Sequence, residues 1–129
     1  MNRIDENIKP NLFIVGAPKC GTTALSAYLK THPDIFVLKE KEVHYFCFDF
    51  SKRYPRPSSM QEYLHHFRNG RGKKVIVDAS PLYLYSNCAI KNAYEFNPKA
   101  KFIAMARNPC EMVPSLHRQL LNNYDEKES

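Results

Sequence analysis

The stretch "NLFIVGAPKCGTTALSAYL", residues 11–29, decides the fold class. It opens with a continuous apolar run over 11–17, which is typical of a strand buried on both faces of a sheet. A loop with two glycines follows, and residues 22–32 then place apolar side chains at helical spacing until Pro33. A strand, a glycine loop and a helix in this order predict an anion-binding loop, because backbone N–H groups and the positive end of the helix meet there.

The remainder of the chain alternates between strand and helix patterns. Further strands are predicted at 34–38, 74–78 and 101–106, and further helices at 58–68, 86–96 and 109–124. Residues 39–57 mix charges with aromatic side chains and end in prolines, which indicates a long loop. This alternation predicts an α/β, P-loop-type three-layer fold with a mainly parallel sheet flanked by helices.

Two helix starts carry recognisable signals. Ser59 and Glu62 have the spacing of a capping box, and Ser86 is the expected N-cap of the helix at 86–96. Ligands of such sheets bind beyond the carboxyl ends of the strands. The segments that should meet at that edge are 16–23, 78–86 and 106–115.

Length and composition predict a single domain over residues 1–129, with residues 1–10 as a loose polar lead-in. The net charge of +6 favours an anionic partner such as a nucleotide, a sulfated sugar, a nucleic acid or a membrane surface. The first ten residues lack the apolar core of a signal peptide, and no apolar run approaches the roughly 20 residues that span a bilayer. Cysteines at 20, 47, 88 and 110 lack zinc-type spacing, so we expect reduced thiols, a cytoplasmic location and no metal site.

The loop after the first strand departs from a Walker loop in one respect. A Walker loop has lysine and then serine or threonine after its second glycine, whereas here Thr22 and Thr23 follow Gly21 and the lysine is Lys19, inside the loop. A transferring sulfuryl group carries less negative charge than a phosphoryl group. One lysine with backbone and hydroxyl donors therefore suffices for it without a metal. The loop alone predicts anion binding and leaves sulfate and phosphate both open.

The segment "PKCGTTAL" resembles the 5′-phosphosulfate-binding loop of sulfotransferases that use 3′-phosphoadenosine 5′-phosphosulfate (PAPS). This resemblance implies that PAPS is the sulfate donor and that no metal takes part. The residues that it assigns to the 5′-phosphosulfate are Lys19, Cys20, Gly21, Thr22 and Thr23.

A second motif, "RNPCEMVPS", follows the strand at 101–106. An arginine fork at Arg107 and a hydroxyl at Ser115 suit a phosphate, because both donate charge-assisted hydrogen bonds. The motif is similar to the 3′-phosphate-binding motif of the same family, except that Pro114 precedes the serine. The resemblance implies that Arg107 and Ser115 bind the 3′-phosphate of the donor.

The segment "KEKEVHYF", residues 39–46, supplies the acid–base candidates. From the residues alone it is a solvated charge run followed by packing aromatics. It resembles the Lys-Glu-x-His-Phe-Phe segment of heparan-sulfate-type and related bacterial sulfotransferases. This implies that Glu42 takes the proton of the acceptor and that Lys19 stabilises the leaving oxygen. His44 is a helper that contacts the acceptor, or the alternative base.

The segment "VDASPLYLY", residues 77–85, looks like the strand-end segment of the same family. Many members with polysaccharide acceptors carry a lysine at the position of Ala79, so one expected contact is absent here. Ser80 and Tyr83 either line the site or form a structural turn at Pro81.

The resemblance covers about residues 10–120 and implies transfer of a sulfuryl group from PAPS to a hydroxyl or amine. It suggests a small-molecule or carbohydrate acceptor, no nucleic-acid partner and no membrane span. Sulfotransferase domains are usually longer, so this chain resembles a short or C-terminally truncated member with weak donor binding and reduced or no turnover. Two alternatives stay open. They are a P-loop kinase or NTPase, in which "VIVD" ending at Asp78 is a Walker B strand, and a non-catalytic nucleotide-binding fragment.

Overall fold

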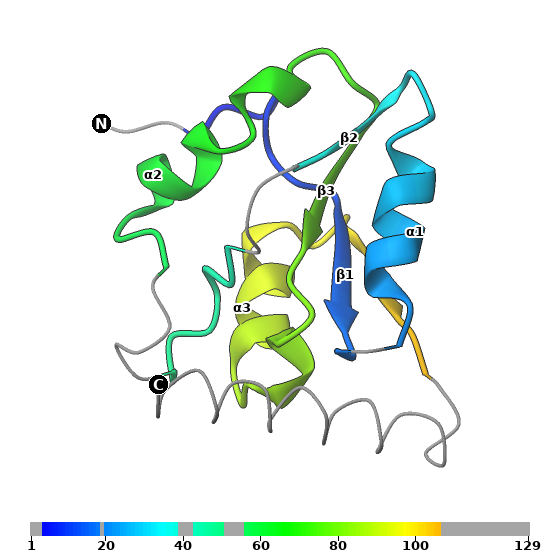
Figure 1. Cartoon of the computed structure of the whole chain (residues 1–129). Coiled ribbons are helices and arrows are strands. Elements are labelled where there is room, and N and C mark those ends of the chain that lie inside the picture. The colour runs from blue at the N-terminus through cyan, green and yellow to red at the C-terminus, as the bar shows by residue number, and fades with distance from the viewer. Residues whose placement is uncertain (1–3, 19, 39–42, 51–55, 107–129) are drawn as a thin grey trace, which may run out of the picture.

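The computed structural model describes residues 4–18, 20–38, 43–50 and 56–106. This part of the chain contains a four-stranded sheet in the order β2-β3-β1-β4, and all three strand pairs are parallel. The predicted parallel α/β sheet is therefore confirmed (Figure 1). The strands are β1 (Leu12–Gly16), β2 (Ile35–Val37), β3 (Val75–Ala79) and β4 (Lys101–Ala104).

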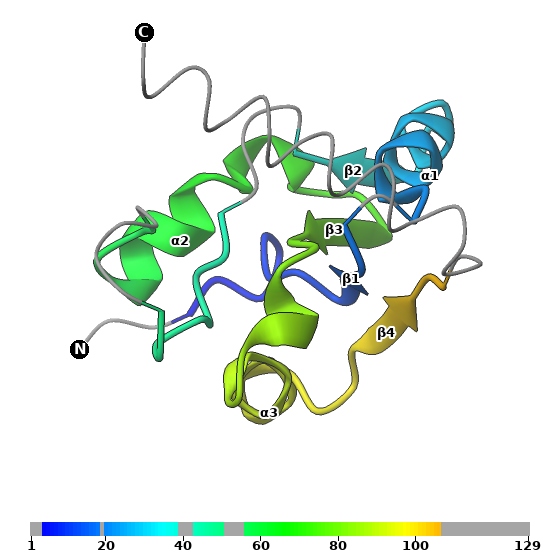
Figure 2. The same cartoon turned by 60° about the horizontal axis from the view of Figure 1, so that its bottom comes forward.

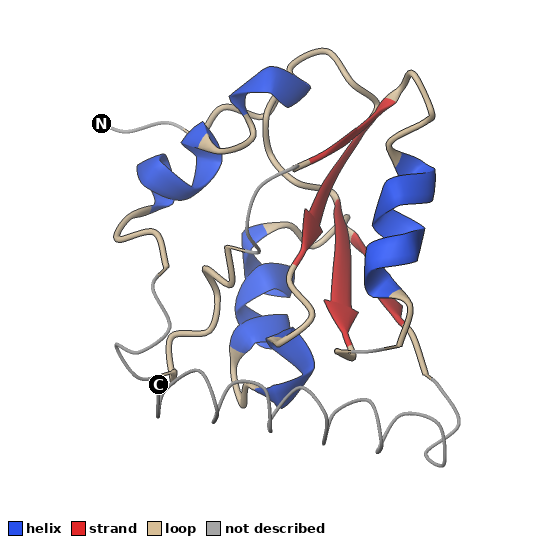
Figure 3. Ribbon diagram, viewed as in Figure 1, coloured by secondary structure: helices blue, strands red, loops and turns tan. Residues whose placement is uncertain are grey.

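Helices cover both faces of the sheet and make a three-layer arrangement. Helix α1 lies on one face, and α2 and α3 lie on the other, as Figures 2 and 3 show. Two short 3₁₀ helices, η1 and η2, connect α2 to β3 and β3 to α3. The helices are α1 (Thr22–Leu29), α2 (Met60–His65), η1 (Arg68–Gly70), η2 (Tyr83–Tyr85) and α3 (Ala89–Phe96).

Strand β1 divides the hydrophobic core in two because successive side chains of a strand point to opposite faces. Phe13 and Val15 belong to the larger cluster, together with side chains of α2 and α3. Ile14 belongs to the smaller cluster, against which Leu25 and Leu29 of α1 pack. The uninterrupted apolar run of β1 thus reflects burial on both sides, as the sequence predicts.

All three described α-helices differ from their predicted bounds. Helix α2 covers Met60–His65 within the predicted 58–68. Helix α1 ends at Leu29 rather than at 32, three residues before the predicted end. Helix α3 begins at Ala89, and its N-cap is Cys88 rather than Ser86. The Ser86 hydroxyl instead accepts hydrogen bonds from the backbone N–H groups of Cys88 (3.1 Å) and Ala89 (3.0 Å), so it holds the turn before the helix.

The capping box predicted for α2 is confirmed for the side chain of Ser59 and wrong for the side chain of Glu62. The Ser59 hydroxyl accepts from the backbone N–H of Glu62 at 3.1 Å. The Glu62 carboxylate, however, accepts from the backbone N–H (2.8 Å) and the hydroxyl (2.6 Å) of Ser58, one residue earlier than a capping box requires. These bonds from Ser58 lower the pKa of Glu62.

Replacement of Ser59 by alanine tests this cap. We expect the free energy of unfolding to fall by about 1 kcal/mol, because the first turn of α2 loses a side-chain acceptor. Ser58→Ala is the matched control and should cost less, since the backbone N–H of residue 58 still reaches Glu62. Urea unfolding of both variants measures the difference. Equal losses would contradict the cap.

The loop predicted at 39–57 supplies core residues. Its described residues 43–50 contain turns and neither helix nor strand, as predicted. Tyr45, Phe46 and Cys47 are nevertheless buried. The Tyr45 ring stacks on Tyr63 with centroids 4.7 Å apart, and the Phe46 ring meets Phe13 edge-on at 6.1 Å. This loop is therefore attached to the face of the sheet that α2 and α3 cover.

Four further predictions concern the strand β4, the C-terminal helix, the cysteines and a membrane span. Strand β4 ends at Ala104, two residues before its predicted end, and the helix predicted at 109–124 lies outside the described residues. Cys20, Cys47 and Cys88 form no disulfide bond with one another, and Cys110 lies outside the described part. Among the helices that the structure describes, none has the length and apolar character that crossing a membrane requires.

Candidate functional site

The carboxyl ends of β1, β3 and β4 meet at one edge of the sheet. Met105, directly after β4, donates its backbone N–H to Gly16 (2.8 Å) and accepts from the backbone N–H of Ala17 (3.1 Å). Ser80, directly after β3, donates its backbone N–H to Ile14 of β1 at 3.0 Å. The predicted convergence is thus confirmed for the described parts of 16–23 and 78–86. Of 106–115, residues 107–115 lie outside them.

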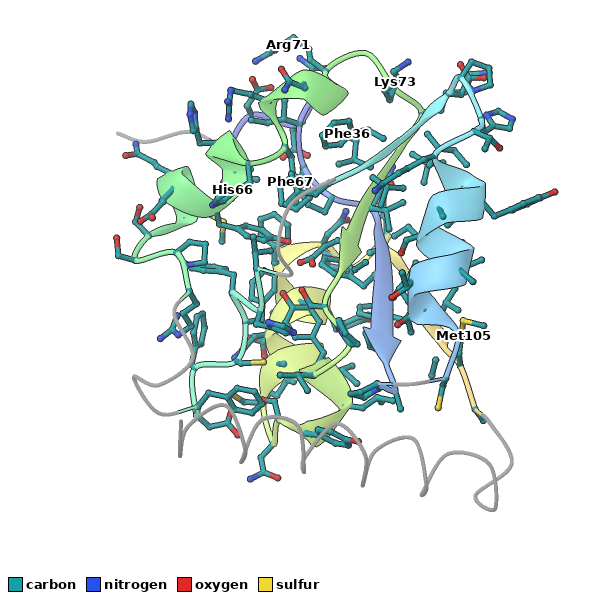
Figure 4. All side chains as sticks on the ribbon, viewed as in Figure 1. Phe36, His66, Phe67, Arg71, Lys73 and Met105 are labelled. Atoms are coloured by element: carbon teal, nitrogen blue, oxygen red, sulfur yellow. The ribbon has the colours of Figure 1, made fainter. Side chains whose placement is uncertain are left out.

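The loop between β1 and α1 turns sharply at its second glycine. Gly21 has a φ of 88°, a left-handed conformation that favours glycine, and it is the N-cap of α1. A Cβ atom there would lie 3.5 Å from the methyl carbon of Met105, which Figure 4 shows beside the start of α1. The turn therefore brings the first amides of α1 to the edge where β4 ends.

The first turn of α1 fits an anion. It contains no acidic residue, and its N-cap, Gly21, has no side chain that could accept from the first amides of the helix, so the positive end of α1 favours a negative charge. Thr22 is buried and Thr23 is exposed, while Cys20 is buried beside them. The structure thus brings Cys20, Gly21, Thr22 and Thr23 together. Lys19, the fifth predicted residue of this set, lies outside the described residues.

A buried carboxylate lies next to this edge, at the end of β3. Asp78 Oδ2 accepts from the hydroxyls of Tyr63 (2.6 Å) and Tyr83 (2.8 Å). Asp78 Oδ1 accepts from the hydroxyl of Ser80 at 2.6 Å. All four side chains are fully buried or nearly so. Asp78 thus joins α2, η2 and the end of β3 in one hydrogen-bonded cluster.

Burial and hydrogen bonding act in opposite directions on this cluster. Burial raises the pKa of the Asp78 carboxyl, and the bonds donated by Ser80, Tyr63 and Tyr83 pull that pKa back down. Burial also raises the pKa values of Tyr63 and Tyr83 well above the ordinary value, and the negative charge of Asp78 adds to this effect. Both tyrosines therefore keep their protons and act as donors to Asp78.

The cluster bears on the alternative in which Asp78 is a Walker B carboxylate. A Walker B aspartate has to hold a hydrated Mg²⁺, whereas both oxygens of Asp78 accept from buried hydroxyls. In the described ranges no cluster of three or more His, Cys, Asp or Glu residues could hold a metal ion. The geometry of Asp78 is that of a structural acceptor.

His44 lies beside the same cluster. Its backbone N–H donates to the Ser80 hydroxyl at 3.2 Å, and its ring is 6.2 Å from the Tyr83 ring in an edge-on arrangement. The structure therefore brings one predicted acid–base residue to the end of β3. Glu42, predicted as the base, lies two residues before His44 in the sequence and outside the described residues, as do Arg107 and Ser115.

The alternative of a structural turn at Pro81 is confirmed. The backbone carbonyl of Ser80 accepts from the N–H of Tyr83 at 3.0 Å, and both side chains are buried. Ser80 and Tyr83 therefore keep their hydroxyls buried and do not expose them to the site.

A second polar cluster ties the 43–50 loop to the start of α3. Asp49 accepts from the Ser86 hydroxyl (2.5 Å) and from the backbone N–H of Asn87 (2.8 Å). These bonds, the Ser86 hydroxyl foremost, lower the pKa of Asp49 to about 2. Burial raises the pKa of the nearby Cys47 thiol to about 12, with the charge of Asp49 as a smaller cause. Cys47 thus stays protonated at neutral pH.

Replacement of Asp49 by asparagine should reduce stability in a pH-dependent way. The folded pKa of Asp49, about 2, lies below its ordinary value of 3.8. The stability that this carboxylate contributes is therefore present above about pH 4 and is lost as the pH falls through the range towards 2. Urea unfolding of the unaltered chain and of Asp49→Asn at pH 6 and pH 2.5 should show that the difference in their free energies of unfolding is smaller at the lower pH.

Glu95→Gln, which removes an exposed carboxylate on α3, is the control for loss of one negative charge. It should leave that pH dependence unchanged. A loss from Asp49→Asn that is the same at both pH values would contradict the contribution of the charge.

Sequence reasoning missed the hydrogen bonds of Asp78 and the bond from the His44 backbone to the Ser80 hydroxyl. Asp78 lies 15 residues from Tyr63 in the sequence, and Ser80 lies 36 residues from His44. Only the local pattern of an aspartate followed two residues later by a serine was visible, and this spacing also fits a turn.

Known proteins that resemble this chain are sulfotransferases. A model of the sulfotransferase family matches residues 10–66, which contain β1, the glycine loop and α2. A crystal structure of a sulfotransferase from Alicyclobacillus acidocaldarius has a TM-score of 0.79 and 35% sequence identity, over 89% of this chain and 51% of that chain.

Curated relatives match over most of this chain but only over a part of their own length. The membrane-associated sulfotransferase kil1 of Dictyostelium discoideum is 30% identical over 79% of this chain and 21% of the relative. The heparan sulfate glucosamine 3-O-sulfotransferase 6 of Mus musculus is 30% identical over 88% of this chain and 31% of the relative. With its parallel sheet and the glycine loop after β1, the chain belongs to the sulfotransferase family.

Proposed function

We propose that this chain transfers a sulfuryl group from PAPS to a hydroxyl or amine acceptor, as all or part of a sulfotransferase. The observation that carries the proposal is the loop between β1 and α1. Its second glycine starts a helix whose first turn contains no acidic residue, and the chain after β4 is hydrogen-bonded beside it. In a chain 35% identical to a sulfotransferase of known structure, this loop is the natural site for the 5′-phosphosulfate.

The 5′ end of the donor would bind to the start of α1. The first backbone amides of the helix and the hydroxyls of Thr22 and Thr23 would donate to it, and Lys19 would neutralise its charge. Cys20 and Gly21 complete this loop. Two of these residues, Gly21 and Thr23, are exposed, which leaves an approach for a ligand. We expect no metal, because the transferring group carries less negative charge than a phosphoryl group.

The 3′-phosphate would be held by Arg107 and Ser115. Arg107 follows Met105 by two residues in the sequence, and Met105 is hydrogen-bonded to Gly16 and Ala17 of the loop. Two residues of chain span at most about 7 Å. The proposal therefore needs no long excursion of the chain to bring a guanidinium to the donor.

Chemistry would then proceed by in-line transfer, with Glu42 as the base. Glu42 takes the proton of the acceptor hydroxyl or amine, whose oxygen or nitrogen forms the new bond to sulfur. Lys19 stabilises the negative charge on the bridging oxygen of the bond that breaks. Arg107 and Ser115 keep the donor in register, and His44 contacts the acceptor or replaces Glu42 as base.

A carbohydrate is the acceptor that we favour. Relatives of this chain include a heparan sulfate glucosamine 3-O-sulfotransferase and a carbohydrate sulfotransferase. Ala79 stands where a lysine is expected for polysaccharide acceptors, so the acceptor need not be a highly charged glycan.

Calorimetry with 3′-phosphoadenosine 5′-phosphate, the product of the donor, tests the proposal against the kinase alternative. We expect this bisphosphate to bind more tightly than ATP with Mg²⁺, and tighter binding of ATP with Mg²⁺ would overturn the donor assignment. Lys19→Ala should weaken binding about tenfold or more, because a charge-assisted hydrogen bond is lost. Lys30→Ala, at the far end of α1, is the matched control and should bind normally.

A sulfate-transfer assay separates an enzyme from a binding module. Glu42→Gln should keep bisphosphate binding and lose transfer. Binding without any transfer by the unaltered chain would favour the alternative of a non-catalytic nucleotide-binding fragment.

A further inference from the structure

The segment that carries the proposed base contains an unusual backbone conformation. His44 has a φ of 47°, in the left-handed region, which residues other than glycine enter at a cost of about 1–2 kcal/mol. Such conformations persist where surrounding contacts hold them. At His44 the contacts include the backbone N–H bond to Ser80 and the carbonyl bond from Cys47 N–H at 3.1 Å.

Ser80 is well suited to hold this turn because its own surroundings restrict it. It is fully buried, and its backbone N–H is bonded to Ile14 of β1. Its hydroxyl has a single hydrogen, which is donated to Asp78 Oδ1 at 2.6 Å. The oxygen is left with lone pairs only, and one of them accepts the N–H of His44.

Asp78 in turn is held in one orientation. Its second oxygen accepts from Tyr63 on α2 and from Tyr83 on η2, so the carboxylate cannot turn away from Ser80 without losing both bonds. Hydrogen bonds therefore link the two tyrosines to Asp78, Asp78 to Ser80, and Ser80 to the backbone of His44.

We propose that Ser80 is a positioning residue for the base-bearing segment: its buried hydroxyl, oriented by Asp78, fixes the backbone at His44 against the end of β3. This rests on the proposed function, since either Glu42, two residues earlier, or His44 itself takes the proton. Ser80 touches neither donor nor acceptor in this role. It sets where the proton acceptor stands relative to the loop that binds the donor, because β1 and β3 are directly paired.

Amide hydrogen exchange, followed by NMR on the full chain without any ligand, tests the proposal directly. In the unaltered chain the His44 amide should be protected, and a freely exchanging His44 amide would overturn the proposal without any variant. In Ser80→Ala its exchange should accelerate about 5–30-fold, the effect of losing one hydrogen bond. The amide of Val77 in β3 is the internal reference.

Tyr63→Phe is the matched control, because it removes a hydroxyl that bonds Oδ2 of the same carboxylate, whereas Ser80 bonds Oδ1. It should not accelerate the His44 amide more than the Val77 amide. If Ser80→Ala and Tyr63→Phe accelerate both amides equally, Ser80 serves general stability only and the proposal is wrong.

Kinetics give a second readout that general destabilisation would not produce. In a sulfate-transfer assay, Ser80→Ala should lower kcat about tenfold with the KM for PAPS unchanged, since the donor loop is intact and only the base is displaced. A raised KM with unchanged kcat would contradict the positioning role. Failure of the unaltered chain to bind the bisphosphate product would count against the proposed function instead, and the exchange experiment would still decide the role of Ser80.

Discussion

Replacement of Asp78 by alanine is expected to lower the free energy of unfolding by about 3–5 kcal/mol. Three buried hydroxyls, those of Tyr63, Tyr83 and Ser80, lose their acceptor together. Each buried donor left without a partner costs about 1–3 kcal/mol. A domain of this size is stable by only about 5–15 kcal/mol, so the variant should lose a large part of its stability.

The size of this effect follows from burial rather than from charge alone. Asp78 and its three partners are all excluded from solvent, so water cannot replace the lost acceptor. Asp78→Asn preserves the volume and one carbonyl oxygen, and we expect it to cost less than alanine. Tyr63→Phe removes one donor and should cost about 1 kcal/mol.

Denaturant unfolding of the three variants checks the order alanine, asparagine, then Tyr63→Phe. A loss below about 1 kcal/mol for Asp78→Ala would be no more than that of an average single substitution. It would mean that the three hydroxyls find other partners and that Asp78 does not organise the end of β3.

The strands and the loop after β1 were predictable because their signals are local. A buried central strand needs an uninterrupted apolar run, and a tight turn into a helix needs glycine, as at Gly16 and Gly21. Both signals lie within one short stretch of sequence. The strand order was not visible in the same way, because pairing of β1 with β3 joins residues more than sixty positions apart.

The 43–50 loop shows where local reasoning ends. Its mixture of charges and aromatics correctly predicted a loop, but loops usually run over the surface. Here the aromatic rings of Tyr45 and Phe46 enter the core and leave the backbone outside regular structure. Their partners, Tyr63 and Phe13, lie far away in the sequence, so the burial could not be read from this segment alone.

The residues of the site were predicted from the sequence, but the hydrogen bonds of Asp78 and Ser80 next to the site were not. Family resemblance selected the residues that would touch the donor, of which Gly21, Thr22 and Thr23 gather at the start of α1. The hydrogen bonds that hold this edge come from Asp78 and Ser80. A carboxylate at the end of a strand looks the same in sequence whether it binds Mg²⁺ or accepts from buried hydroxyls, and only its three-dimensional partners distinguish the two.

Replacement of Gly16 by alanine is expected to lower the free energy of unfolding by about 2–5 kcal/mol and to weaken binding of the bisphosphate product. A Cβ atom at Gly16 would lie 2.7 Å from Leu84 Cδ1 and 2.8 Å from the backbone oxygen of Pro81. Leu84 could shift, but the carbonyl of Pro81 is held by the turn that follows β3. The φ of 152° adds a conformation that residues with a side chain rarely adopt.

Two other glycines separate crowding from backbone conformation. Gly72 has a φ of 87° and open space where a methyl group would stand, so Gly72→Ala should cost about 1–2 kcal/mol from conformation alone. At Gly70 a Cβ atom would meet the Phe36 ring at 2.9 Å without a positive φ, so Gly70→Ala should report crowding alone. Figure 4 shows Phe36 at the end of the sheet away from Met105.

Gly16→Ala combines the cost of crowding with the cost of backbone conformation, and it also affects the loop that would hold the donor. Residue 16 accepts the N–H of Met105 and begins the loop that would hold the donor, so a shift there moves the loop relative to β4. Calorimetry should show weaker bisphosphate binding for Gly16→Ala and normal binding for the folded Gly70→Ala and Gly72→Ala chains. If all three variants bind alike, the backbone at residue 16 does not set the geometry of the donor loop, and the close approach of β1 to the turn at Pro81 serves packing only.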